Sequence, residues 1–132
     1  SIDRLKIVER LSEQRPVGTR ALNVCVQFNV SGEASKSGVK LEELGTLCKA
    51  VDALPNINLR GLMAIPAPTL DTAAQRATFA AVRKAQDSLN AQGLNLDTLS
   101  MGMTDDLDSA IAEGATMVRI GTAIFGARDR KV

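Results

Sequence analysis

Two strand-to-helix junctions between Leu99 and Gly126 contain the residues whose types and spacing could do chemistry. In each junction a glycine, Gly102 or Gly121, stands where the backbone could approach a ligand closely. The start of a helix offers unpaired N–H groups and the positive end of a dipole, so an anion binds there readily. Arg119 stands at the end of the second expected strand. The stretch therefore predicts a site for a phosphate-bearing ligand.

The two junctions differ in their charge. The first has Asp105 and Asp106 in the first turn of its helix, where they favour the helix but repel a phosphate. The second has no acidic residue before Asp129. We therefore expect the backbone amides of Gly121 and Thr122 to hold most of the charge of the anion.

Other polar groups of the stretch surround this expected anion site. Ser100 and Gly102 are expected to close over the anion. Alternation along residues 116–120 puts Arg119 on the same face as Met117, and an arginine that faces into a sheet or barrel needs a partner. A carboxylate would be that partner if Arg119 had only a structural role, so the ligand and the structural interpretation both remain open.

Composition excludes several kinds of chemistry. The 132 residues carry a net charge of +1 and are 45% hydrophobic, which is typical of one soluble domain. With no His and no Tyr, the chain itself cannot form a Ser-His-Asp triad, a Cys-His pair or the commonest zinc sites. The near-neutral charge and 2% aromatic content argue against nucleic acid as a partner.

Nothing in the sequence indicates a membrane segment or a targeting peptide. No apolar run is long enough to cross a bilayer, and the first residues resemble neither a signal peptide nor a transit peptide. The two cysteines, Cys25 and Cys48, do not form a disulfide framework, so we expect them to be reduced. These observations predict a cytoplasmic protein.

The hydrophobic pattern predicts helices that alternate with strands. Helices are expected over 3–14, 41–54 and 72–91, in a fourth stretch that begins at Thr104 and is closed by Gly114, and in a short final helix from 123. Strands are expected over 22–30, 59–65 and 94–99, with a buried strand over 116–120. This alternation implies a parallel sheet with right-handed crossovers. A (β/α)8 barrel typically needs about 250 residues, so we predict one partial domain over residues 1–132 that forms strands 5–8 of such a barrel.

Four single positions have specific expected roles in this fold. In a closed barrel the polar side of the strand over 22–30 would face the interior, which places Asn29 at the mouth. The polar loop that follows contains Lys36, which we expect to be solvated. Thr104 is expected to cap its helix, and Gly61 within a strand predicts a close approach of backbone.

Several motifs together resemble a known family. They are Ser1–Asp3, the loop Asn29–Gly38, the strand Arg60–Ile65, the run Ser100–Asp106 and the run Met117–Gly126. They look like the C-terminal part of the YggS or pyridoxal phosphate homeostasis family, also called the proline synthase co-transcribed proteins. The resemblance covers essentially the whole chain.

The resemblance implies a barrel like the N-terminal domain of alanine racemase, with pyridoxal 5′-phosphate (PLP) as its ligand. By position, Ser100 and the amides of Gly121 and Thr122 would hold the phosphate, and Arg119 would approach the pyridine nitrogen. An arginine there keeps this nitrogen unprotonated, which suits carrying the cofactor better than amino-acid chemistry. Methionines would line the ring site, although they could equally be ordinary core residues. The expected cofactor-binding residues are Ser100, Met101, Gly102, Met103, Arg119, Gly121, Thr122, Asn29 and Met63.

One feature of the family has no match in this chain. The lysine that binds PLP covalently in the family follows the first barrel strand, in a segment that does not occur here. We therefore expect this chain to be the C-terminal half of a longer protein whose lysine lies upstream.

Four functional hypotheses follow. The first is a non-enzymatic carrier that buffers PLP and passes it to PLP-dependent apoenzymes. The second is a PLP-dependent racemase, which would need bases that this chain lacks. The third is a structural half-barrel whose open edges pair with the missing half or with a second copy. The fourth is another phosphate-binding barrel enzyme.

Overall fold

The computed structural model describes residues 1–33 and 37–129 as an α/β fold built on parallel strands. The sheet has the order β1-β2-β3, with β1 at Leu22–Gln27, β2 at Ile57–Met63 and β3 at Thr98–Ser100. The helices are α1 (Leu5–Gln14), α2 (Leu41–Asp52), α3 (Thr72–Ala91), α4 (Leu107–Ala112) and α5 (Thr122–Phe125), with a 3-10 turn at Thr104–Asp106 before α4. The predicted fold class, α/β with parallel strands, is confirmed.

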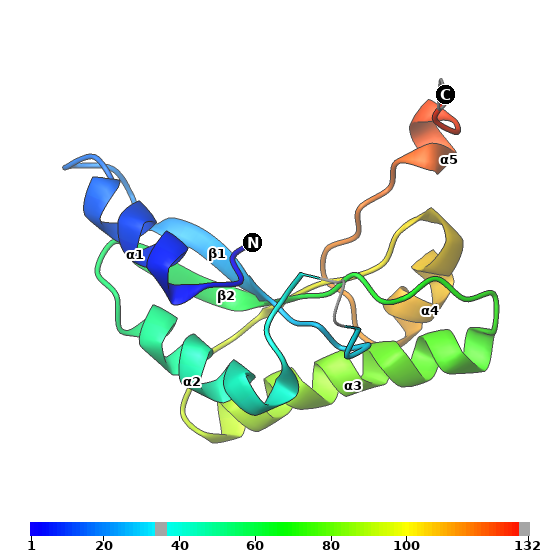
Figure 1. Cartoon of the computed structure of the whole chain (residues 1–132), viewed down its shortest axis with the longest axis horizontal. Coiled ribbons are helices and arrows are strands. Elements are labelled where there is room, and N and C mark those ends of the chain that lie inside the picture. The colour runs from blue at the N-terminus through cyan, green and yellow to red at the C-terminus, as the bar shows by residue number, and fades with distance from the viewer. Residues whose placement is uncertain (34–36, 130–132) are drawn as a thin grey trace.

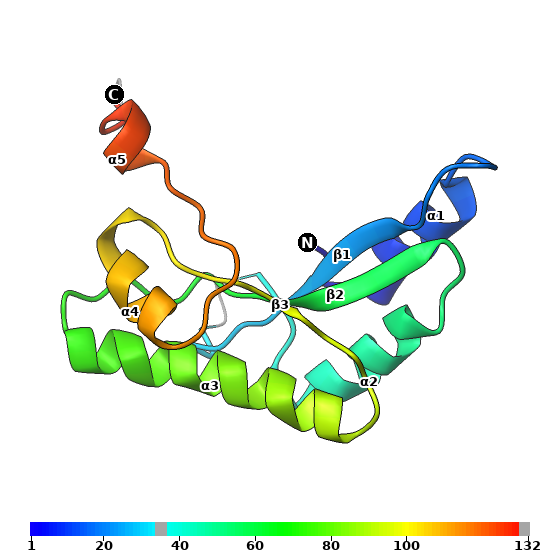
Figure 2. The ribbon, with the colours of Figure 1, turned by 180° about the vertical axis from the view of Figure 1, so that it is seen from behind.

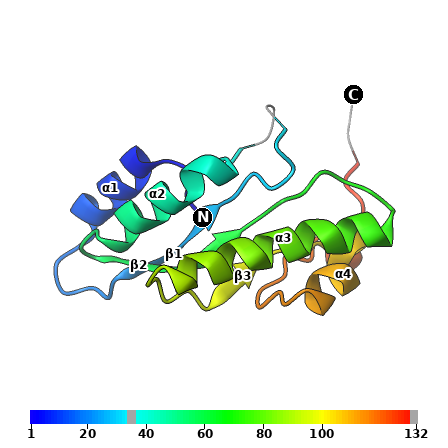
Figure 3. The ribbon, with the colours of Figure 1, turned by 90° about the horizontal axis from the view of Figure 1, so that it is seen from below.

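The helices α1, α2 and α3 pack along one side of the sheet (Figures 1 and 3). Their apolar stripes and the apolar side of the strands form one core. Its fully buried larger side chains are Phe79, Leu62, Met101, Val8, Val26, Val51, Val82 and Cys48. The view from behind shows that the chain passes from β3 into α4, and that the segment after α4 carries α5 away from this core (Figure 2).

Helix α3 forms where the sequence predicts it. The Asp71 carboxylate caps it by accepting hydrogen bonds from the N–H groups of Ala73 (3.0 Å) and Ala74 (3.3 Å). Its apolar stripe buries Phe79 and Val82 against the sheet. A 20-residue helix held in this way fixes the loops at both of its ends.

The predicted close approach at Gly61 is confirmed. A Cβ atom on Gly61 would lie 1.7 Å from the carbonyl oxygen of Thr98, so no larger residue fits between β2 and β3. The pairing of β1 with β2 shifts by one residue between Val24 and Cys25. Buried Gln86 of α3 accepts the N–H of Leu62 at 3.0 Å, which satisfies the backbone beside this irregularity.

The expectation of a buried strand over 116–120 is wrong for this chain. Only one parallel bridge forms, between Ser100 and Met117, and the side chains of Met117 and Val118 are 52% and 38% exposed. A strand at this position has β3 on one side only, and no helix covers it among residues 1–33 and 37–129. Its apolar residues therefore lack the neighbours that would bury them.

Smaller differences also have local causes. β1 and β3 are shorter than the predicted strands, whereas β2 has the predicted length but begins and ends two residues earlier. Phe28 forms only an isolated bridge with Val39. The prediction that Thr104 caps its helix is wrong: Thr104 is the first residue of the 3-10 turn, Met103 holds the cap position, and the Thr104 hydroxyl accepts the N–H of Ala123. Lys36 lies outside the described residues. That residues 1–132 are one partial domain corresponding to strands 5–8 stays a prediction.

Candidate functional site

The carboxyl ends of β2 and β3 meet the segment that follows the last bridge of the sheet. Met63 lies opposite Ser100 in the parallel register, and the N–H of Ala64 donates to the Ser100 carbonyl at 3.0 Å. The N–H of Arg119 donates to the carbonyl of Gly102 at 2.9 Å. The structure therefore brings four predicted residues, Met63, Ser100, Gly102 and Arg119, to one edge of the sheet, where ligands bind in parallel α/β folds.

Arg119 is the most informative residue of this edge. Its Nη2 donates to the carbonyl of Ala64 at 2.7 Å, and its Nε is buried with no hydrogen-bond partner in the described chain. Burial lowers the pKa of the Arg119 guanidinium from its ordinary value, and the charge of Asp106 opposes that shift. A buried donor without a partner costs about 1–3 kcal/mol, so this nitrogen is poised for an acceptor.

The residues between β3 and Arg119 differ in their surroundings. Ser100 is 5% exposed, and its hydroxyl makes no hydrogen bond to any described residue. Met101 is fully buried in the core, as the core interpretation of the methionines predicts, whereas Met103 is 46% exposed. Gly102 has a positive φ of 104°, and a Cβ there would lie 2.7 Å from the Cβ of Ala110.

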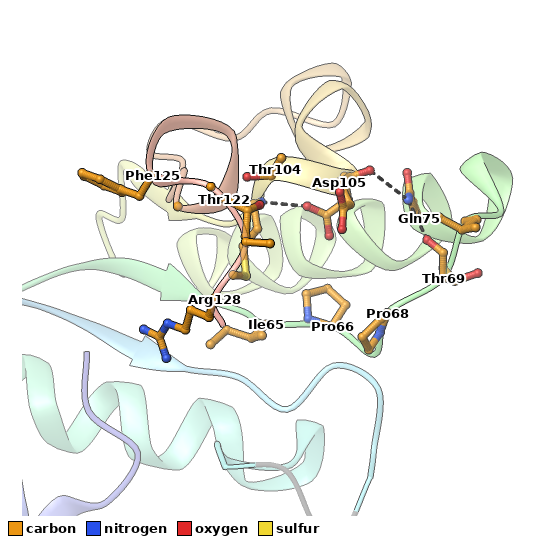
Figure 4. Close-up of a pocket in the computed structure, with 16 residues that line it drawn as sticks. Ile65, Pro66, Pro68, Thr69, Gln75, Thr104, Asp105, Thr122, Phe125 and Arg128 are labelled. Carbon is orange, nitrogen blue, oxygen red and sulfur yellow. Dashed lines mark hydrogen bonds between the residues drawn. The ribbon is translucent and has the colours of Figure 1, made fainter. Parts of the chain in front are cut away.

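A cavity of about 1240 Å³ opens beside this edge (Figure 4). Three predicted residues, Met103, Gly121 and Thr122, line it, and the other six do not. Its walls are the loop from β2 to α3, the 3-10 turn and the segment that contains α5. The other lining residues are Ile65, Pro66, Pro68, Thr69, Leu70, Gln75, Thr104, Asp105, Asp106, Phe125, Gly126, Ala127 and Arg128.

The sequence predicts that the amides at the start of α5 hold the anion. Within residues 1–33 and 37–129, no acceptor is bonded to the N–H of Gly121 or Thr122. The next amide, on Ala123, donates to the Thr104 hydroxyl at 3.2 Å. Thr104 thus links the 3-10 turn to the segment that carries these amides, and Asp105 and Asp106 line the same cavity.

Asn29 lies at the carboxyl end of β1, next to the other two strand ends. Its neighbour Phe28 donates its N–H to the carbonyl of Met63 at 2.8 Å. The Asn29 side-chain amide donates to the carbonyl of Glu33 at 2.8 Å, within its own loop. In this structure Asn29 therefore holds the loop after β1 and does not line the cavity.

Two cavity features escaped the sequence analysis. Pro66 and Pro68, in the loop after β2, line the cavity. Gln75, in the first turn of α3, points into the same region (Figure 4). The available signal was position, since the loop that contains Pro66 and Pro68 follows the carboxyl end of β2 and leads into the first turn of α3, where Gln75 lies. No cluster of metal-ligating side chains occurs in the described parts of the chain.

A family model described as the alanine racemase N-terminal domain matches residues 1–129. The chain belongs to this family. Its curated relatives include the pyridoxal phosphate homeostasis protein of Pseudomonas aeruginosa, 66% identical over 129 residues, and that of Escherichia coli K12, 53% identical over 129 residues. Each match covers 98% of this chain and 55% of the relative, so the chain spans about half the length of the curated relatives it matches. The resemblance to this group is confirmed.

Solved structures agree with this assignment. PipY of Synechococcus elongatus without PLP is 34% identical, with a TM-score of 0.85 over 96% of this chain and 60% of PipY. PipY with PLP bound gives 33% identity and a TM-score of 0.83 over 96% of this chain and 59% of PipY. A Bifidobacterium adolescentis protein of unknown role has a TM-score of 0.86 at 38% identity, over 95% of this chain and 51% of its own. The alanine racemase-like fold is thus established. No helix in the described part of the chain has the length and apolarity to span a bilayer.

Proposed function

We propose that this chain supplies the phosphate-binding part of a protein that holds PLP and passes it on. The observation that carries the proposal is the buried, unpartnered Nε of Arg119 at the same sheet edge as the Ser100 hydroxyl. The segment continues from Arg119 into the unpaired amides of Gly121 and Thr122. One stretch therefore offers a cation and several neutral donors to an anionic, nitrogen-containing ligand.

The residues present fit PLP. The amides of Gly121 and Thr122, with the Ser100 hydroxyl, would hold its phosphate, and Arg119 would meet the pyridine nitrogen. When bound, PLP supplies an electron sink, and a cationic guanidinium at the ring nitrogen weakens that capacity. The Ala64 carbonyl orients the Arg119 guanidinium through Nη2, which leaves Nε for the ligand.

The carrier role rests on the kind of residues available. The chain has no His and no Tyr, so it offers neither of these as a general base for racemisation. Relatives that match nearly all of this chain are named for PLP homeostasis, and PipY has been solved with PLP. We propose PLP-dependent apoenzymes as recipients and the cytoplasm as the compartment, and we expect the covalent lysine in a part of the protein that this chain does not contain.

The test uses the full-length gene product and the visible absorbance of PLP. Arg119→Met should weaken PLP binding about tenfold or more, because a charge-assisted hydrogen bond is lost, and Ser100→Ala should weaken it less. Arg10→Met, on the exposed side of α1, is the matched control and should bind PLP as the wild type does. Unchanged affinity in both site variants would refute this placement of the ligand. If the full-length protein rapidly converts L-alanine to D-alanine, the carrier hypothesis is wrong and the racemase hypothesis takes its place.

A further inference from the structure

Gln75 is a buried glutamine that joins three segments around the cavity. It lies in the first turn of α3 and is 9% exposed. Its Nε2 donates to the carbonyl of Thr69 at 2.8 Å and makes a longer contact of 3.5 Å with the carbonyl of Asp105. Its Oε1 accepts the Ser109 hydroxyl at 2.7 Å. Figure 4 shows the side chain between the loop that holds Thr69 and the turn that holds Asp105.

Two partners of Gln75 belong to different walls of the cavity, and the third lies in α4, which does not line it. Thr69 lies in the loop from β2 to α3, Asp105 in the 3-10 turn, and Ser109 in α4. Ser109 is itself buried, at 4% exposed. One side chain thus sets the separation of the proline-containing loop from the turn that begins the opposite wall.

The 3-10 turn connects Gln75 to the segment that contains α5. Thr104, next to Asp105, accepts the N–H of Ala123 at 3.2 Å. The amides of Gly121 and Thr122 directly precede Ala123 in the chain. The Gln75 side chain is therefore connected to the predicted phosphate donors through two hydrogen bonds, one to Asp105 and one between Thr104 and Ala123.

We infer that Gln75 is a positioning residue for the ligand pocket, acting through Asp105 and Thr104 on the amides that bind the phosphate. The inference rests on the proposed function. Gln75 has both an acceptor and a donor in use, and only an amide of this length supplies both. A methionine would keep the volume and lose all three contacts, whereas a glutamate would keep the Ser109 contact and place a carboxylate against two carbonyl oxygens.

The chain offers a matched control on the same helix. Gln86 is also buried, at 5% exposed, and its Oε1 accepts the N–H of Leu62 at 3.0 Å in the core of the sheet. Gln86 does not line the cavity. Gln86→Met and Gln75→Met make the same chemical change on α3, so both should lower the thermal midpoint of unfolding, but only Gln75→Met should alter the pocket.

The experiment measures PLP affinity by absorbance, and amide hydrogen exchange without ligand, in the full-length gene product. Gln75→Met and Gln75→Glu should each weaken PLP binding about tenfold, which corresponds to the loss of one or two hydrogen bonds. Exchange of the Met103 and Ala123 amides, which donate to Asp106 and Thr104, should become faster than in the wild type. Gln86→Met should bind PLP within about twofold of the wild type. If a Gln75 variant does not fold, Ser109→Ala, which removes one contact only, should show the same changes at smaller size.

Three results would overturn the inference: unchanged affinity in Gln75→Met, an equal loss in Gln86→Met, or unchanged exchange of the Met103 and Ala123 amides. Failure of the proposed function can be distinguished from failure of the role inferred for Gln75. A wild-type protein that retains no PLP would refute the proposed function. The exchange data on the ligand-free protein would then decide the role of Gln75 by themselves.

Discussion

The region where α3 packs on β2 and the segment from Met117 to Gly126 use the same kinds of residues with opposite results. Phe79 in the first region is fully buried, and Phe125 in the second is 85% exposed. Val82 is likewise fully buried, whereas Val118 is 38% exposed. Apolar residue type therefore does not decide burial in this chain. A side chain is buried where its segment has neighbouring strands or helices on both sides.

The cause lies in the topology of the sheet. Strand β2 is central, with β1 and β3 on its two edges and helices over its apolar face. The segment after Met117 touches the sheet through a single bridge to Ser100. The curated relatives are nearly twice as long as the matched region, since this chain spans 55% of them. Burial of the segment from Met117 to Gly126 would require packing partners other than residues 1–33 and 37–129.

The largest expected effect compares the two phenylalanines. Phe79→Ala should lower the free energy of unfolding by about 3–5 kcal/mol, because it removes a large side chain from a closed core and leaves a cavity. Phe125→Ala should change it by less than about 0.5 kcal/mol, because the ring is already hydrated. Urea unfolding of this chain, followed by circular dichroism, measures both. Equal losses would mean that the segment around α5 is packed in solution.

The second comparison concerns two glycines, one in each region. Gly61→Ala should cost about 2–3 kcal/mol, because its Cβ would overlap the Thr98 carbonyl and separate β2 from β3. Gly121→Ala should cost less than about 0.5 kcal/mol, since its φ is −115° and nothing lies within 4 Å of the added Cβ. The same unfolding measurement applies. If Gly61→Ala were tolerated, the tight contact between the two strands would be absent in solution.

The sequence predicted the first region well because local and global signals agree there. The helical stripe through Phe79, the cap at Asp71 and the close approach at Gly61 each need only nearby residues. The second region failed at residues 116–120, whose strand pattern is intact but whose pairing requires a second neighbour. Periodicity reports which face a residue prefers and not whether a partner is present.

The candidate site divides in the same way. The meeting of Ser100, Gly102 and Arg119 at one sheet edge was predictable, because parallel strands end together. The roles of Gln75 and of the Ala64 carbonyl were not, because each depends on a hydrogen bond between segments far apart in the sequence. Whether the nine predicted residues bind the ligand stays a prediction.

A smaller effect is expected where α4 is attached to α3. Glu113 is buried and pairs with Arg76 at 3.1 Å and Arg83 at 3.5 Å, and both arginines are about half exposed. Glu113→Gln should lower the free energy of unfolding by about 1–2 kcal/mol, less than a fully buried pair would lose, because water already screens the arginines. Glu9→Gln, on the exposed side of α1, is the control and should have no measurable effect. A loss shared by both variants would indicate a general charge effect.

The smallest effect concerns an ion pair on the sheet itself. Arg60 donates to Asp97 through Nε (3.0 Å) and Nη2 (2.9 Å), and this contact holds the pKa of Asp97 below its ordinary value of 3.8. A carboxylate with a lowered folded pKa adds stability above its ordinary pKa, and that stability is lost as the pH falls through the folded value. Asp97→Asn should therefore be less stable than the wild type at pH 7, and this difference should shrink as the pH falls below 3.8. Asp87→Asn on α3 is the control, because it makes the same charge change at a residue without a described ion-pair partner. Urea unfolding of both variants at pH 7 and near pH 3 separates the effect of the Arg60–Asp97 pair from the general effect of charge. A difference for Asp97→Asn that stays the same at both pH values would show that the bidentate contact does not form in solution.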